Sequence, residues 1–148
     1  MIVRLAAAMI GLSATPALAQ DIAGSWKFQT GDIKPNLGCT VSGALTLKNA
    51  SEDDQPMQCE MNVLYQCKQQ PGYHILTRQP CEVTRKGKSI IIAGTSYEII
   101  EENRAPSWGD KYYPEHFTVS LLREGGTMSG RYAAKTTARF ERVKDFAE

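Results

Sequence analysis

The sequence predicts an all-β protein: a single small antiparallel, up-and-down β-barrel of about eight strands, with two disulfides and a cleaved signal peptide before it. Three observations predict this fold. Apolar residues recur at every second position in short runs, which is the period of a strand with one buried face. Residues that favour turns separate these runs, without a long helical pattern between them. The cysteines number four, an even count, and all follow the leader.

The first segment of the chain, 1–19, has the layout of an export signal. It begins with a positive charge at Arg4, continues through an apolar run, and ends at Pro16–Ala19 in the small-x-small pattern that signal peptidase cleaves. We expect cleavage before Gln20, which leaves 20–148 as one domain in the bacterial periplasm or secreted from the cell. An uncleaved N-terminal anchor is the alternative. No apolar run approaches the roughly 18 residues of a membrane span, so we expect no membrane insertion.

The charge balance gives no reason to bind a polyanion. The whole chain has 17 basic and 16 acidic residues, and removal of the leader removes Arg4, which leaves 16 of each. A neutral domain has no overall field that attracts nucleic acid or an anionic membrane. With 42% hydrophobic and 22% charged residues, the composition is that of a globular domain. Because neutrality also removes repulsion between copies, we expect a monomer or a weak dimer.

The first three strands share one alternating pattern. Ser25–Thr30 reads S-W-K-F-Q-T, with apolar residues at alternate positions. Cys39–Leu47 alternates in the same way, and Cys59–Cys67 continues the parity of its cysteines. Each run therefore predicts a strand with one face in the core.

The fourth strand is expected in two parts, Tyr73–Leu76 and Cys81–Val83. Pro80 has no backbone N–H and cannot donate to a ladder, so it predicts an interruption, as a bulge or an edge position. Lys88–Ala93 is mostly apolar and predicts the next strand, and Glu124–Gly126 is the clearest hairpin turn. The remaining strands are expected at Ser96–Glu101, Glu115–Arg123, Met128–Ala133 and Thr136–Val143.

The four cysteines are expected to form disulfides rather than a metal site. The C-x-x-C spacing that zinc ribbons and thioredoxin-like sites use does not occur. A metal site that combines His74 with Cys67 and Cys81 is the alternative. We expect no metal and no cofactor.

Hairpin geometry favours one pairing of the cysteines. Residues that face each other across an antiparallel hairpin have numbers with a constant sum. A turn centred near residue 53 places the first cysteine opposite the third, and a turn centred near residue 70 places the second opposite the fourth. A slip of one residue in register would undo this arrangement. Of the three connectivities that four cysteines allow, we favour Cys39–Cys67 with Cys59–Cys81.

Short antiparallel strands without helices between them can close into a barrel or stack as a sandwich. We favour the barrel because closure removes exposed strand edges. Gly24–Trp26 forms a G-x-W motif at the start of the first strand, and Gly130, Phe140 and Arg142 lie in the last two strands. On these residues the chain resembles the calycin-like small barrels: lipocalins, avidins and bacterial metalloprotease inhibitors. The resemblance implies that Trp26 lies at the closed end of the barrel with Arg142 over its ring.

The connection Glu101–His116 is the main candidate binding site. It has 16 residues, whereas a hairpin usually needs about two to five. Its aromatic side chains supply contact area at low entropic cost, which binding surfaces favour. They can also fold back and plug one mouth of the barrel. The residues expected to bind a ligand or a partner are Trp108, Tyr112, Tyr113, His116 and Phe117.

The barrel interior is a second candidate site. Six residues on inward parities either line a small apolar pocket or, as the simpler account, fill the core of so small a barrel. These residues are Met61, Tyr65, Phe117, Leu121, Met128 and Tyr132.

The sequence contains no recognisable catalytic motif. It has no G-x-S-x-G, H-E-x-x-H, Walker or Rossmann pattern, and its two histidines are His74 and His116. Glu101 with Glu115 is the carboxylate pair that suggests a glycosidase. We expect no catalysis. The sequence predicts instead an exported binding protein, for a protein partner such as a hydrolase or for a small apolar or glycan ligand. The alternatives are an envelope structural or stress protein without a ligand, and a small periplasmic hydrolase.

Overall fold

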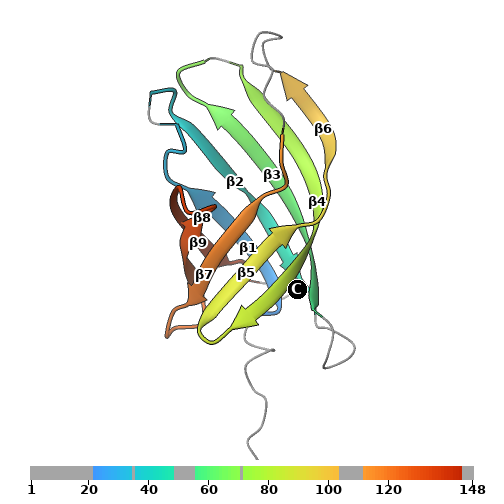
Figure 1. Ribbon diagram of the computed structural model, residues 1–148, viewed down its shortest axis with the longest axis vertical. Coiled ribbons are helices and arrows are strands. Elements are labelled where there is room, and N and C mark those ends of the chain that lie inside the picture. The colour runs from blue at the N-terminus through green and yellow to red at the C-terminus, as the bar shows by residue number, and fades with distance from the viewer. Residues whose placement is uncertain (1–21, 35, 49–55, 71, 104–111, 145–148) are drawn as a thin grey trace, which may run out of the picture.

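A computed structural model describes residues 22–34, 36–48, 56–70, 72–103 and 112–144. In these ranges the chain forms nine antiparallel strands and no helix (Figure 1). None of the described segments is a helix long and apolar enough to cross a membrane. The expected signal segment, 1–19, lies outside the described residues. The strands are β1 (Gly24–Thr30), β2 (Cys39–Leu47), β3 (Met57–Cys67), β4 (His74–Lys86), β5 (Ser89–Gly94), β6 (Glu98–Asn103), β7 (His116–Leu121), β8 (Thr127–Tyr132) and β9 (Thr136–Arg142).

Eight of these strands close into a ring, as the sequence predicts. The order β3-β2-β1-β9-β8-β7-β5-β4 is closed by the additional pairing of β3 with β4. Strand β6 follows β5 along the chain and pairs with the first part of β4, so it lies outside the ring. The expected antiparallel barrel is therefore confirmed, with β6 as an added strand at its upper end in Figure 1.

Both disulfides join residues that face each other in the ladder. Cys39 lies opposite Cys67 between β2 and β3, and Cys59 lies opposite Cys81 between β3 and β4. The connectivity predicted from the turns is confirmed, and all four cysteines are buried. Restricting the unfolded chain in this way stabilises the fold by about 3–4 kcal/mol for each bridge. The metal site with two of these cysteines is excluded, because the sulfur of Cys67 is bonded to that of Cys39 and the sulfur of Cys81 to that of Cys59.

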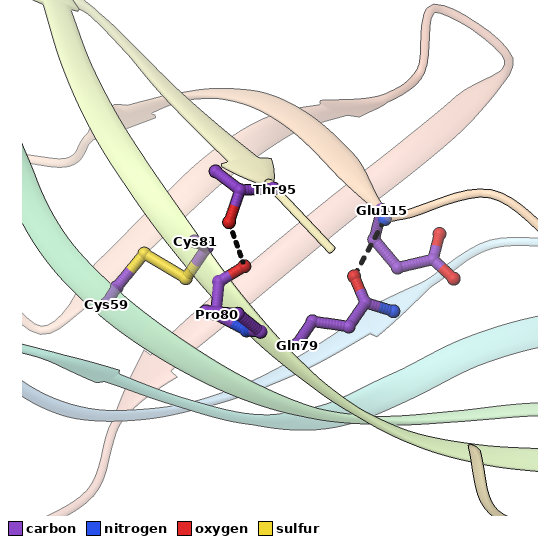
Figure 2. Close-up of a disulfide and its surroundings, with 6 residues drawn as sticks. All are labelled: Cys59, Gln79, Pro80, Cys81, Thr95 and Glu115. Carbon is purple, nitrogen blue, oxygen red and sulfur yellow. Dashed lines mark hydrogen bonds between the residues drawn. A yellow bond between two sulfur atoms is a disulfide. The ribbon is translucent and has the colours of Figure 1, made fainter. Parts of the chain in front are cut away.

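The expected division of the fourth strand at Pro80 is wrong, because β4 runs through this residue without a break. The expected break in a ladder is found on one side of β4, where β5 pairs from Cys81 onward and β6 pairs only up to Arg78. The N–H of Thr95 donates to the Pro80 carbonyl at 2.9 Å, and its hydroxyl donates to the same oxygen at 3.2 Å (Figure 2). In an antiparallel ladder the N–H and C=O of one residue point to the same side. The missing N–H of Pro80 thus faces the gap between Gly94, where β5 ends, and Glu98, where β6 begins.

The middle of the barrel is filled by its own aromatic side chains. Phe28 on β1 lies opposite Phe140 on β9, with ring centroids 5.1 Å apart. Phe117 contacts both rings, at 5.2 and 5.0 Å. The candidate interior residues contribute to this packing: Met61, Phe117 and Met128 are fully buried, and Tyr65, Leu121 and Tyr132 are partly buried against them.

The lower end of the barrel is closed around Trp26. The guanidinium carbon of Arg142 lies 4.4 Å from the centroid of the indole, which is the contact that the resemblance to calycin barrels implies. The indole N–H donates to the carbonyl of Ile22 at 2.9 Å. Arg142 also donates to the carbonyls of Ala23, at 2.6 Å, and Gly125, at 3.2 Å. It therefore joins the start of β1 to the turn between β7 and β8.

Two inward positions accept no side chain. A Cβ on Gly43 would lie 1.9 Å from the carbonyl oxygen of Asn62 and 2.8 Å from the ring of Phe28. A Cβ on Gly130 would lie 2.1 Å from the carbonyl oxygen of Thr118. Since backbone atoms cannot retreat as a flexible side chain can, the curvature of the barrel requires glycine at both positions.

We expect Gly43→Ala to destabilise the oxidised protein by about 1–3 kcal/mol or more, because the added methyl overlaps the backbone of β3. Urea unfolding of 20–148 measures this loss. Gly126→Ala is the matched control, because a Cβ there meets nothing within 4 Å, and it should change stability by less than about 0.5 kcal/mol. Equal losses in the two variants would contradict the close approach at Gly43.

Candidate binding surface at the barrel mouth

The upper end of the barrel holds the residues that precede β7. This end, the mouth, is where β3 turns into β4 and β8 turns into β9 (Figure 1). Residues 112–115 lead into β7 here, and β6 stands beside them. Opposite them, Arg142 and Trp26 close the lower end. The mouth is therefore the end at which the connection singled out from the sequence begins and ends.

The structure separates the predicted site residues into two environments. Tyr112 is half-buried, and Phe117 is fully buried in the core. Tyr113 is 71% exposed, and His116 is also exposed. Trp108 lies outside the described residues. Tyr112 is thus turned inward, as in the alternative in which the aromatic residues plug the barrel mouth. Tyr113 and His116 are exposed to solvent, as a binding surface requires.

A buried carboxylate holds Tyr112 in place. Glu115 is only 2% exposed, and each of its carboxylate oxygens accepts a hydrogen bond from a phenol. The hydroxyl of Tyr112 donates to Oε1 at 2.5 Å, and the hydroxyl of Tyr132 on β8 donates to Oε2. A buried charge is costly unless it is hydrogen-bonded, so these two phenols meet the main requirement of the site.

Gln79 on β4, which only β5 separates from β7 in the ring, completes this network. Its side-chain oxygen accepts the backbone N–H of Glu115 at 2.9 Å (Figure 2). Its Nε2 donates to the hydroxyls of Thr77, at 2.9 Å, and Tyr112, at 2.7 Å. Gln79 is itself 0% exposed, and the disulfide at Cys81 attaches its strand to β3 two residues later. The network therefore joins the segment before β7 to a covalently fixed part of the wall.

Burial dominates the electrostatics of this network. It raises the pKa of the Glu115 carboxyl above its usual range, while hydrogen bonds from the two phenols and the charge of Lys135 act in the opposite direction. Burial, reinforced by the negative charge of Glu115, also raises the pKa of Tyr112 and of Tyr132. Both phenols therefore keep the protons that they donate to the carboxylate.

Thr77 and Gln79 are not among the site residues predicted from the sequence. A usable signal exists: both share the inward parity of Cys81, and polar side chains on an inward face need a buried partner. Their partner, Tyr112, lies more than 30 residues further along the chain, and nothing in the local pattern connects the two segments.

The carboxylate pair suggested for a glycosidase is divided between two environments. Glu115 lies inside the network, whereas the side chain of Glu101 on β6 is 66% exposed. The Nε2 of His74 lies 2.8 Å from Oε1 of Glu101, and this hydrogen bond raises the pKa of the imidazole. Within the described ranges, no group of three or more His, Cys, Asp or Glu residues could hold a metal ion.

Three exposed large apolar side chains belong to the two segments that adjoin the network, residues 97–100 and 112–115. Tyr97 is 41% exposed, Ile100 is 47% exposed, and Tyr113 has the highest exposure of the three. The ring of Tyr97 packs edge-on against Tyr112, with centroids 5.0 Å apart, so the buried network supports the exposed residues beside it. We call Tyr97, Ile100 and Tyr113 the mouth rim.

We expect the stability of the wild type relative to Glu115→Gln to fall as pH rises from about 4.5. The raised pKa means that the folded state favours the neutral carboxyl. The contribution of Glu115 to the free energy of unfolding is complete when the pH is below the pKa of this carboxyl in the unfolded chain. It is lost as the pH rises through the pKa of the carboxyl in the folded protein. Urea unfolding of both proteins across this range measures the difference, with Glu124→Gln on an exposed turn as the control for a lost charge. A difference that grows with pH would show that the phenols outweigh burial.

Comparison with known proteins gives a likeness of fold but no family. No protein-family model matches the chain, and no curated protein does. A solved structure of a de novo designed fluorescence-activating β-barrel is similar to this chain with a TM-score of 0.43 and 14% sequence identity. The match covers 84% of this chain and 96% of the designed one.

Proposed function

We propose that this protein is a non-catalytic, exported β-barrel that binds a protein partner at the mouth rim. The observation that carries the proposal is the distribution of large apolar side chains. The middle of the barrel is occupied by the chain's own aromatic residues, while most of the exposed large apolar side chains of the described part lie at the mouth. The other, Leu122, lies in the turn at the lower end.

The buried network supports a binding role for the rim. Interfaces gain most of their affinity from a few aromatic anchors, and a surface that is already ordered loses less entropy on binding. Tyr112 is held by Glu115 and Gln79, and it supports Tyr97 directly and Tyr113 through the backbone. The rim therefore offers two tyrosines on a rigid base.

Several observations favour binding over the hydrolase alternative. Both oxygens of Glu115 already accept hydrogen bonds from tyrosines, and Glu101 contacts His74 on the outer surface. In the part of the chain that the structure describes, the two carboxylates therefore have separate hydrogen-bond partners. Turnover of a glycoside that is lost in Glu115→Gln would instead favour the hydrolase.

The proposed location is the bacterial periplasm or the exterior of the cell. Two buried disulfides are typical of a protein that folds in an oxidising environment, and segment 1–19 has the layout of a cleaved signal. The Arg142–Trp26 contact supports the proposed likeness to calycin barrels, some of which bind hydrolases or small ligands.

We expect Tyr113→Ala to weaken capture of the partner by at least tenfold, about 1.4 kcal/mol, because it removes an exposed aromatic anchor. Immobilised 20–148 is incubated with envelope extract, and the affinity of the captured protein is then measured. Leu122→Ala removes an exposed apolar side chain from the opposite end and should leave capture unchanged. Equal capture by both variants would contradict partner binding at the mouth rim. Retention of only a small molecule or glycan would favour a role as a ligand carrier.

A further inference from the structure

Strand β6 has an edge that the ring does not pair. Among the strands that the structure describes, it pairs with β4 alone and stands last in the sheet order. Strand β7 pairs with β5 up to Ala93 and His116, and one further hydrogen bond joins Gly94 to Glu115. Beyond that point β6 continues upward, apart from β7 (Figure 1). An edge of this kind is a template for another extended chain.

The charges on β6 indicate which chain would fit. Glu98, Glu101 and Glu102 are three of its six residues, and it contains no basic residue. The side chains of Glu98 and Glu101 are 69% and 66% exposed. Pairing with β6 of a second copy would bring two acidic strands together, which like-charge repulsion disfavours. An extended segment rich in Lys or Arg would gain from the same charges.

The geometry of β6 also restricts how a second strand can approach. Leu76 faces Glu101 and Thr77 faces Ile99, so Ile100 is an extra residue in a bulge. Arg78 and His74 contact Glu98 and Glu101 from β4 at 3.7 and 2.8 Å, on the side away from the free edge. Two edges of β6 are thereby distinguished: one is paired with β4, and the other is paired with none of the strands in the described ranges.

We propose that the free edge of β6 receives an extended, basic segment of the partner protein as an added strand. This inference rests on the proposed function and names the chemistry of the partner. Backbone hydrogen bonds supply a sequence-independent part of the affinity, and the acidic side chains select Lys and Arg. Tyr97, directly before β6, and Tyr113 can pack on the stems and charges of such residues.

Synthetic peptides test this inference on the oxidised chain 20–148. The probes are a ten-residue peptide of alternating Lys and Thr, its counterpart with Glu in place of Lys, and the Lys peptide with N-methyl groups at alternate residues. We expect the Lys peptide to bind at least tenfold more tightly than the other two, and more weakly at higher salt. In its presence, hydrogen exchange should slow at the β6 amides that face away from β4, which side-chain binding alone would not produce.

Charge reversal supplies the matched variants. Glu98→Lys combined with Glu101→Lys should reverse the preference toward the Glu peptide. Glu124→Lys combined with Glu141→Lys makes the same charge change away from β6 and should preserve it. Equal binding of the three peptides would overturn the inference. Slow exchange in the free protein of the β6 amides that face away from β4 would overturn it as well.

Measured together, partner capture and peptide binding distinguish a failure of the mouth rim from a failure of strand addition at β6. If capture of the partner depends on Tyr113 but is unchanged by the β6 charge reversal, the edge inference fails and the proposed function stands. If Tyr113→Ala leaves capture unchanged while the Lys peptide protects β6, the rim fails and the edge inference stands.

Discussion

Backbone pairing around a closed ring of eight strands is the constraint on which the rest of the structure depends. Closure satisfies both edges of each ring strand and fixes the width of the interior. The inward side chains must then fit that width, so aromatic rings fill the centre while Gly43 and Gly130 admit close backbone approach. Because side chains occupy the interior, the proposed recognition uses surfaces outside the ring: the mouth rim and the edge of β6 that no described strand pairs with.

Alternation in the sequence was sufficient to predict much of this fold, because burial on one face leaves a period of two in the residues themselves. Pairing followed from turn positions, and the constant sum across each hairpin identified both disulfides. Pro80 misled the prediction, since the cost of its missing N–H depends on what lies opposite. Here the ladder changes partner from β5 to β6 at that point, and no local pattern reveals it.

The candidate site was less predictable than the fold. In the expected cluster of aromatic residues, neighbours in sequence point to opposite sides. Tyr112 is hydrogen-bonded to buried Glu115, whereas Tyr113 is exposed to solvent. Spacing along the sequence identifies such a segment but does not show which of its residues are buried and which are exposed. The orientation of these residues depends on Glu115 and Gln79. Their buried polar groups find hydrogen-bond partners only when segments distant in sequence meet. Polar networks of this kind specify one arrangement because any other leaves a charge without partners.

The two disulfides overlap along the chain, and this has a consequence for biosynthesis. The first cysteine bonds with the third and the second with the fourth. A chain oxidised in the order in which its cysteines emerge would first join Cys39 to Cys59, a non-native bridge. Native pairing therefore requires either that β2 and β3 find their register before oxidation or that a thiol–disulfide isomerase reshuffles early bridges. The yield of natively paired protein should depend on the isomerase supply of the host as well as on sequence.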